Sequence, residues 1–128
     1  MNGPPVCSRG EIWMLDWNPR RDSEQAGYRP GIIVQSDLGN HAPGARTTIV
    51  VPLTTQERPY AFYIPLPKGR GTGLKSPSWA NCTQILTIDT ARLKERLGCV
   101  DEESLGKIGM ALLDTLELGS TRPIPSPC

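Results

Sequence analysis

The sequence predicts a mainly β domain of the α+β class, in which a small twisted antiparallel sheet or barrel packs against one C-terminal helix. Five short runs are rich in β-branched and aromatic residues, and polar segments containing Gly, Pro and Asn separate them. Helical periodicity appears only late in the chain. At 128 residues with 38% hydrophobic content, the chain has room for a single core and a single site.

Strands are the first elements expected along the chain. They cover residues 11–17, 31–35, 47–54, 61–64 and 79–88. Turn segments cover residues 18–28, 39–44 and 68–73. The last of these is glycine-rich but lacks a Gly-Lys-Ser/Thr ending and a following helix, so it predicts a mobile, basic hairpin loop and no nucleotide-phosphate cradle.

Two helices are expected after the strands. Asp89 or Thr90 can cap a short helix that runs through Leu97 and ends at Gly98. Glycine favours this end because it adopts left-handed backbone angles without steric cost.

The second expected helix is longer. Asp101 can cap it, two glutamates occupy its first turn, and Gly119 lies just past its end. Four apolar residues share one of its faces: Leu105, Ile108, Leu112 and Leu116. This stripe must be buried, which places the helix against one side of the sheet.

The ends of the chain differ from its middle. Residues 1–8 and 119–128 predict a flexible N-terminal tail and a Pro-rich C-terminal tail around a folded domain at residues 9–118. No signal core or membrane-length apolar run is present, so we expect a cytoplasmic protein without membrane contact. Four widely spaced cysteines without a CxxC pair, and His41 as the only histidine, predict reduced thiols, no metal site and no cofactor.

Charge is unevenly distributed. Residues 20–75 carry a net charge of +4 and the flanks −3. Aromatic residues such as Tyr28 and Trp79 lie near these charges, a mixture that single-stranded nucleic-acid grooves use for phosphate contact and base stacking. A solvated rim of loops around core aromatics explains the same pattern equally well.

One polar stretch, residues 23–30, lies between two apolar strands. Glu24 and Arg29 in this stretch can converge on one phosphate, since guanidinium binds phosphate oxygens in a bidentate fork. The alternative is a surface ion pair across a turn.

Four segments resemble the MazF/PemK family of toxin endoribonucleases, or mRNA interferases, in order and spacing. They have the sequences RGEIW (9–13), SEQAGYRP (23–30), IVVPLTTQ (49–56) and QILTID (84–89). The resemblance spans residues 9–118 and implies an SH3-barrel-like sheet with a C-terminal helix, a homodimer and a partner MazE-like antitoxin with an acidic, apolar tail. It also implies metal-independent, sequence-specific cutting of single-stranded RNA.

The resemblance also implies roles for particular residues. Arg29 and Thr54 match the two principal active-site residues of the family, and Glu24 matches the acidic residue of the same motif. Gln84 matches the glutamine before the Thr-Ile-Asp segment. From its chemistry, Glu24 is the candidate general base and Arg29 the candidate clamp on the phosphate oxygens. We expect RNA contacts from Arg20, Arg21, Gln25, Tyr28, Thr55, Gln56, Arg58, Arg70, Lys75 and Gln84.

Two other functions remain open at this point. A gyrase inhibitor resembling CcdB has this kind of fold but needs an aromatic and aliphatic C-terminal tip, whereas residues 122–128 read RPIPSPC. An SH3-like module that binds nucleic acid without cutting it is the second alternative.

Overall fold

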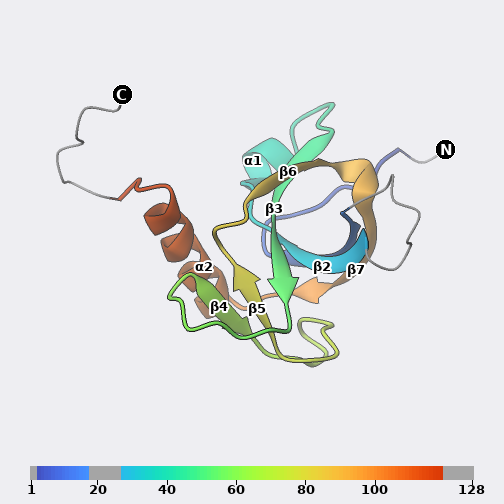
Figure 1. Ribbon diagram of the computed structural model, residues 1–128. Coiled ribbons are helices and arrows are strands. Elements are labelled where there is room, and N and C mark those ends of the chain that lie inside the picture. Colours follow the sequence, from blue (N-terminus) through green and yellow to red (C-terminus); the bar gives the residue numbers. More distant parts are fainter. Residues whose placement is uncertain (1–2, 18–26, 120–128) are drawn as a thin grey trace.

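A computed structural model describes residues 3–17 and 27–119 (Figure 1). Its strands are β1 (Glu11–Asp16), β2 (Tyr28–Ile33), β3 (Thr47–Thr54), β4 (Tyr63–Leu66), β5 (Ser78–Asn81), β6 (Leu86–Asp89) and β7 (Leu93–Cys99). The helices that lie wholly within these ranges are α1 (Asp37–Asn40), the one-turn 3₁₀ helix η2 (Thr90–Arg92) and α2 (Glu102–Thr115). None of the described helices is long and apolar enough to cross a membrane.

The described strands form one antiparallel sheet that curves into a ring. Its order is β4-β5-β3-β2-β1-β7, and β6 also pairs with β3. Five of the strands therefore form a continuous path in the order β6-β3-β2-β1-β7. The strands β6 and β7 lie at the two ends of this path, and η2 connects them in the sequence. Figure 1 shows these strands curving around a common axis, with β4, β5 and α2 on the outside of the ring.

The two faces of the curved sheet bury two separate clusters, because side chains alternate between faces along each strand. Inside the ring, residues from all five of its strands pack together, including Trp13, Leu15, Val50 and Leu93. Cys7, from the segment before β1, is 1% exposed and belongs to this inner cluster.

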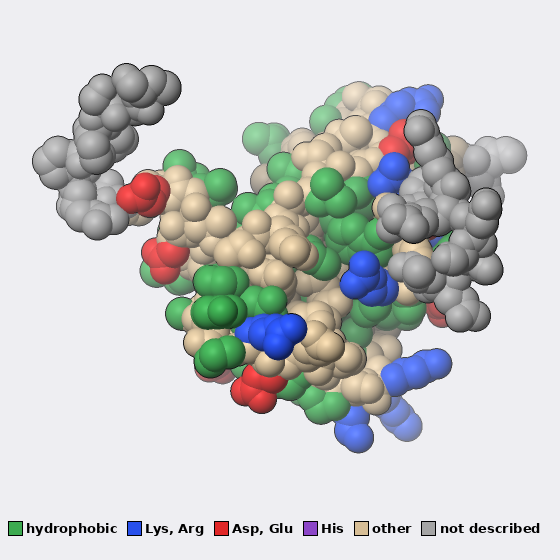
Figure 2. Space-filling model, in the orientation of Figure 1, with side chains coloured by type: hydrophobic (Ala, Val, Ile, Leu, Met, Phe, Trp, Pro, Cys, Tyr) green, Lys and Arg blue, Asp and Glu red, His purple; other side chains and the backbone are tan. Residues whose placement is uncertain are grey.

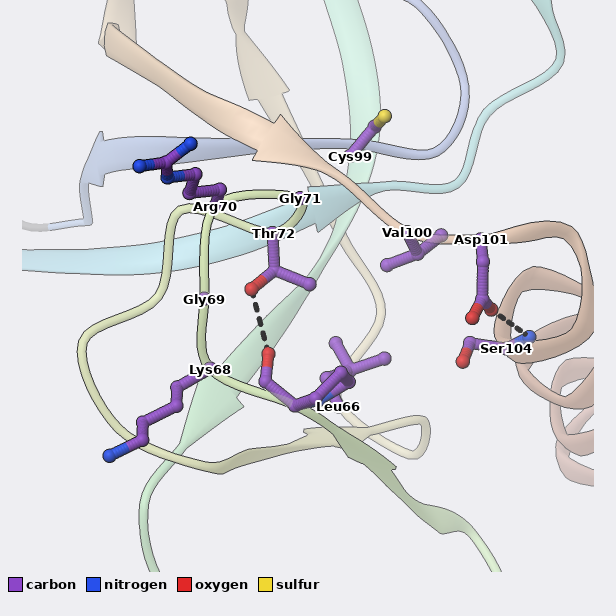
Figure 3. Close-up of a pocket in the computed structure, with 11 residues that line it drawn as sticks. Leu66, Lys68, Gly69, Arg70, Gly71, Thr72, Cys99, Val100, Asp101 and Ser104 are labelled. Carbon is purple, nitrogen blue, oxygen red and sulfur yellow. Dashed lines mark hydrogen bonds between the residues drawn. The ribbon is translucent and has the colours of Figure 1, made fainter.

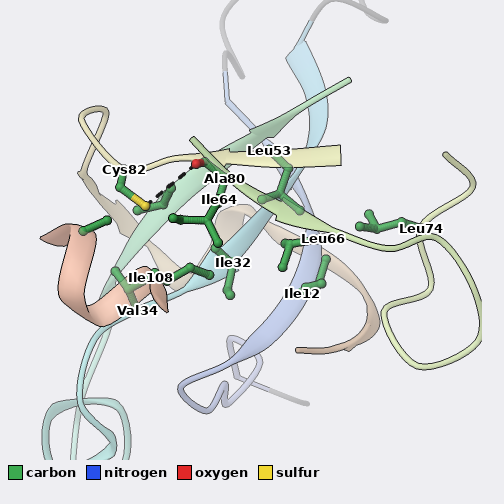
Figure 4. Close-up of a cluster of buried hydrophobic side chains, with 12 residues drawn as sticks. Ile12, Ile32, Val34, Leu53, Ile64, Leu66, Leu74, Ala80, Cys82 and Ile108 are labelled. Carbon is green, nitrogen blue, oxygen red and sulfur yellow. Dashed lines mark hydrogen bonds between the residues drawn. The ribbon is translucent and has the colours of Figure 1, made fainter. Parts of the chain in front are cut away.

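The outer cluster is larger and holds the helix in place. It joins the outer faces of β1 to β3 to the strands β4 and β5 and to Ile108 of α2 (Figure 4). Burying a side chain such as Ile108 stabilises the fold by roughly 1.5–3 kcal/mol relative to leaving it exposed.

The helix α2 begins where the sequence predicts. Asp101 Oδ1 accepts a hydrogen bond from the backbone N–H of Ser104 at 2.8 Å, and this bond lowers the pKa of the Asp101 carboxyl. Ile108 is fully buried, but Leu116 is 54% exposed. The helix ends at Thr115, short of the predicted boundary, and Glu117 (φ 55°) takes the left-handed conformation that the sequence suggested for a glycine.

The predicted helix over residues 89–97 is wrong. Asp89 does cap a turn, because its carboxylate accepts from the backbone N–H of Ala91 at 2.8 Å. The helix stops after the single turn η2, and Leu93–Cys99 is the strand β7, paired with β1 along its length. An eight-residue helix is marginal by itself, so long-range strand pairing outweighs its local propensity.

The single strand predicted at residues 79–88 is also wrong, since the structure has two strands there. Asn81 Oδ1 accepts from the backbone N–H of Thr83 at 3.2 Å, and the N–H of Gln84 donates to the Asn81 carbonyl at 3.1 Å. This turn ends β5 and lets β6 pair with a different part of β3. Two further boundaries are shifted, because β4 begins later and β2 earlier than predicted.

The glycine-rich loop is tied down by hydrogen bonds and packing. The Cys99 N–H donates to the Gly71 carbonyl at 2.9 Å, and the Gly69 N–H donates to the Leu74 carbonyl at 3.1 Å. Gly73 has φ 74°, and a β-carbon there would overlap the backbone of β7. Glycine is therefore required where the loop backbone lies directly against the strand.

Candidate functional site

Arg29 and Thr54 come together because β2 and β3 are neighbours in the sheet. Gly31 pairs with Pro52 in their antiparallel ladder. Continuing this register by two residues makes Arg29 the cross-strand neighbour of Thr54, with both side chains on the same face of the sheet. That face also carries Val50, which is buried inside the ring. The two predicted catalytic residues therefore lie at one mouth of the ring, where its apolar lining gives way to polar groups.

A hollow of about 160 Å³ lies at this mouth. Its lining is Arg29, Pro52, Leu53, Thr54, Gln56, Arg58, Tyr63, Asn81 and Gln84. We call it the Arg29 hollow. Five of the residues predicted from the sequence are brought together in it: Arg29, Thr54, Gln56, Arg58 and Gln84.

The Arg29 guanidinium is available for a ligand. Its residue is exposed, and within the described ranges its side chain has no ion pair or hydrogen bond. Its backbone is held, because the carbonyl accepts a hydrogen bond from Trp17 Nε1 at 3.0 Å. A fixed backbone, with a guanidinium that has no partner in the described ranges, suits capture of a phosphate through two parallel N–H donors.

Thr54 and the residues that follow it are ordered by short-range hydrogen bonds. Thr54 Oγ1 accepts from the Gln56 backbone N–H at 3.1 Å, which leaves the hydroxyl proton available to donate. Gln56 Oε1 in turn accepts from Arg58 Nη2 at 3.0 Å. These bonds hold a hydroxyl and a second guanidinium on the same rim as Arg29.

Tyr63 and Asn81 line the hollow, although neither was predicted as a site residue. They are cross-strand partners in the β4–β5 ladder, and Asn81 Nδ2 donates to the Tyr63 hydroxyl at 3.2 Å. The signal that could have found them is alternation. Leu53 and Ala80 point into the outer core, so their neighbours Thr54 and Asn81 must point to the opposite face.

The other predicted residues fall into two groups, those that the structure does not describe and those that lie outside the lining of the hollow. Arg20, Arg21, Glu24 and Gln25 lie outside the described residues. Tyr28 is exposed at the start of β2, and Thr55 and Lys75 are exposed in loops. In Figure 2, Lys and Arg side chains are scattered over the visible face at separate points and form no continuous band.

Arg70 lines a different cavity. That cavity measures about 350 Å³ and lies between the glycine-rich loop and the start of α2 (Figure 3). The Lys68 and Arg70 side chains point away from it, while Thr72 Oγ1 donates to the Pro67 carbonyl at 2.7 Å. Because the Thr72 hydroxyl and the Asp101 carboxylate are already hydrogen-bonded and the two cations point outward, this cavity does not form a phosphate cradle.

Metal chemistry, and thiol chemistry beside the hollow, are not supported by the described part of the chain. No group of three or more His, Cys, Asp or Glu side chains there could hold a metal ion. Cys82, beside Asn81, is fully buried, and burial raises the pKa of its thiol to about 11. A thiol with that pKa stays protonated near neutral pH and is a poor nucleophile.

The fold is a small ring of β-strands with a helix on its outside, and an arginine-containing hollow lies at the mouth of the ring. This arrangement is suited to a protein that acts on a phosphate ester. The chain matches the model of the PemK-like, MazF-like toxins of type II toxin-antitoxin systems over residues 8–116. It therefore belongs to this toxin family, which confirms the resemblance drawn from the four sequence motifs.

Curated relatives support this assignment. The chain is 35% identical over 119 residues to endoribonuclease MazF9 of Mycobacterium tuberculosis (strain ATCC 25618 / H37Rv), covering 90% of this chain and 100% of the relative. It is 28% identical over 113 residues to endoribonuclease EndoA of Bacillus subtilis (strain 168), covering 88% and 97%.

Solved structures have the same fold. An endoribonuclease from a mycobacterial species superposes with a TM-score of 0.72 at 23% identity, covering 91% of this chain and 96% of the other. A mycobacterial endoribonuclease in complex with its cognate antitoxin gives a TM-score of 0.71 at 24% identity, covering 93% and 99%. A MazE–MazF structure from Deinococcus radiodurans gives 0.69 at 18% identity, covering 90% and 100%. The predicted fold class, a mainly antiparallel sheet with a C-terminal helix, is confirmed.

Proposed function

We propose that this protein is the endoribonuclease toxin of a type II toxin-antitoxin system and that it cuts single-stranded RNA at specific sequences in the cytoplasm without a metal ion. The observation that carries the proposal is the Arg29 hollow, in which β2 and β3 set Arg29 opposite Thr54. Membership of the toxin family supports the same conclusion. We propose residues 9–118 as the endoribonuclease domain.

The proposed reaction uses the nucleophile that RNA itself carries. The 2′-hydroxyl attacks the adjacent phosphorus, the 5′-oxygen leaves, and the products are a 2′,3′-cyclic phosphate and a 5′-hydroxyl. This route requires a base for the 2′-hydroxyl proton, stabilisation of charge on the phosphorane and a proton for the leaving oxygen.

Arg29 and Thr54 supply the charge stabilisation in this proposal. The Arg29 guanidinium donates to two non-bridging oxygens, and it keeps its proton throughout because its basicity is very high. The Thr54 hydroxyl donates to one phosphate oxygen, and its β-branched side chain holds that hydroxyl stiffly at the strand end.

Glu24 is the proposed base for the 2′-hydroxyl proton. It lies five residues before Arg29 in the same motif, outside the described residues. A carboxylate is a suitable base for this proton while Arg29 holds the scissile phosphate.

The RNA chain is proposed to extend beyond the hollow on both sides. Gln56, Arg58 and Gln84 line the hollow and can contact phosphates or base edges. The remaining predicted contacts are proposed for the flanking nucleotides: Arg20, Arg21, Gln25, Tyr28, Thr55, Arg70 and Lys75. Because several of these are cations, RNA affinity should fall as salt concentration rises.

We also propose two protein partners, a second copy of the chain and an antitoxin. A homodimer would cover sheet edges and the exposed apolar residues of α2, such as Met110. An antitoxin tail that mixes acidic and large apolar residues would place carboxylates where RNA phosphates bind. The solved structure of a mycobacterial endoribonuclease in complex with its cognate antitoxin supports such a pairing.

The partner proposals have direct tests. Light scattering of the purified toxin should give the mass of two chains at micromolar concentration, and a monomer mass would contradict the dimer. Saturating antitoxin should prevent binding of a non-cleavable 2′-deoxy-substituted RNA. If RNA affinity were unchanged, the antitoxin would have to act at another surface.

The proposed function is tested by incubating purified protein with end-labelled single-stranded RNA, with and without EDTA. We expect cutting at discrete sites at equal rates in both conditions, because no step uses a metal. RNA binding without cutting would favour the SH3-like module. Neither cutting nor binding, together with inhibition of gyrase, would favour the CcdB-like alternative.

A further inference from the structure

Tyr63 and Asn81 form an oriented pair inside the Arg29 hollow. Asn81 Nδ2 donates to the Tyr63 hydroxyl oxygen at 3.2 Å. The orientation of the amide is determined on its other side, where Asn81 Oδ1 accepts from Thr83 N at 3.2 Å and from Thr83 Oγ1 at 2.8 Å. Because the amide oxygen faces Thr83, the amide nitrogen must face Tyr63.

This pair leaves the Tyr63 proton available. A tyrosine hydroxyl has one proton to donate and can also accept. The Tyr63 hydroxyl oxygen accepts the hydrogen bond from Asn81. No acceptor for the Tyr63 proton occurs among the side chains and carbonyls of residues 3–17 and 27–119. Tyr63 is half-buried and lines the hollow, so a ligand there can take this proton.

We propose that Tyr63 is the catalytic residue that gives a proton to the leaving 5′-oxygen, with Asn81 as its positioning residue. This inference rests on the proposed function. Among the described residues that line the hollow, Tyr63 is the only side chain with a suitable acidity. Guanidinium groups hold their protons too strongly, amides do not act as acids near neutral pH, and the Thr54 hydroxyl is no stronger an acid than the alcohol that leaves.

The step balances with the groups named. The 2′-oxygen forms its bond to phosphorus and its proton passes to the Glu24 carboxylate. The bond between phosphorus and the 5′-oxygen breaks, and its electron pair stays on that oxygen, which takes the Tyr63 proton. The hydrogen bond from Asn81 stabilises the phenolate that forms, and exchange with water then returns a proton to Tyr63 and removes one from Glu24.

The test compares two leaving groups. One RNA carries the ordinary 5′-oxygen at the cut, and the other carries a bridging 5′-sulfur there, which leaves as a thiolate and needs no proton. Tyr63→Phe should cut the oxygen substrate about 10²-fold more slowly in kcat than the parent does. It should cut the sulfur substrate within a factor of about three of the parent rate.

A matched control and a second variant complete the design. Tyr60 stacks on Phe62 with ring centroids 5.0 Å apart and does not line the hollow, so Tyr60→Phe should cut both substrates at the parent rate. Asn81→Ala should lower kcat on the oxygen substrate with little change in KM, and the sulfur substrate should restore its rate. Circular dichroism checks that each variant is folded.

The outcomes separate this inference from the proposed function. Failure of the parent protein to cut any RNA would overturn both. If the parent cuts RNA, and Tyr63→Phe loses the same factor on both substrates or loses nothing on either, the proton-donor role is wrong while the endoribonuclease stands.

Discussion

Replacing Arg29 with alanine is expected to lower the rate of RNA cleavage by ~10²–10³-fold, since it removes the main donor to the developing phosphorane charge. The guanidinium is exposed and has no partner within the described residues, so its removal leaves no buried group unsatisfied. The fold should therefore be unchanged, with thermal unfolding close to that of the parent. Single-turnover cleavage of a labelled RNA measures the effect.

Arg46→Ala provides the matched control. It removes the same charge from an exposed arginine just before β3, whereas Thr54 and the hollow lie at the other end of that strand. Eight residues of extended chain separate the two positions by roughly 25 Å. Arg46→Ala should cut at nearly the parent rate. A folded Arg29→Ala variant that was no slower than Arg46→Ala would contradict the assigned site.

Replacing Thr54 with alanine should slow cleavage by ~10²-fold, because one hydroxyl donor to the phosphate is lost. The change also removes the acceptor for the Gln56 backbone N–H, at a cost of about 1 kcal/mol in unfolding free energy. That cost is too small to unfold a typical domain. The Thr54→Ala variant should therefore show a large loss of cleavage rate and only a small loss of unfolding free energy.

Thr54→Ser isolates the hydroxyl from the rest of the side chain. Serine keeps the donor and the acceptor for the Gln56 N–H but loses the methyl group that stiffens χ1. It should retain most of the parent rate. If serine were as slow as alanine at this position, the hydroxyl would not be the group that acts.

Local patterns predicted only part of the fold. The strand β3 was placed correctly because apolar and β-branched residues run unbroken through Thr47–Thr54. The start of α2 was placed correctly because its cap and first turn are local signals. The strand β7 was mistaken for a helix, because its pairing with β1 depends on residues about eighty positions away in the chain.

The sequence likewise predicted only part of the site. Motif spacing indicated Arg29 and Thr54, and the structure brings both to one hollow because they lie on paired strands. For Asn81, alternation along β5 indicates the face of the sheet, but the proximity of Tyr63 and Asn81 follows from the β4–β5 register and from the turn after Asn81, which the sequence does not show. The charge pattern is compatible with either a nucleic-acid groove or a solvated rim of loops, and in the structure Arg70 lines a separate cavity.

The most direct test of the proposed chemistry is a single 2′-deoxy substitution at the nucleotide whose 2′-hydroxyl would attack. With all-ribose RNA, the products should carry a 2′,3′-cyclic phosphate and a 5′-hydroxyl, as determined by mass spectrometry. With the substituted RNA, binding should persist and no cleavage should occur at that position. Cleavage of the substituted RNA at the same position would require an external nucleophile and would contradict attack by the 2′-hydroxyl.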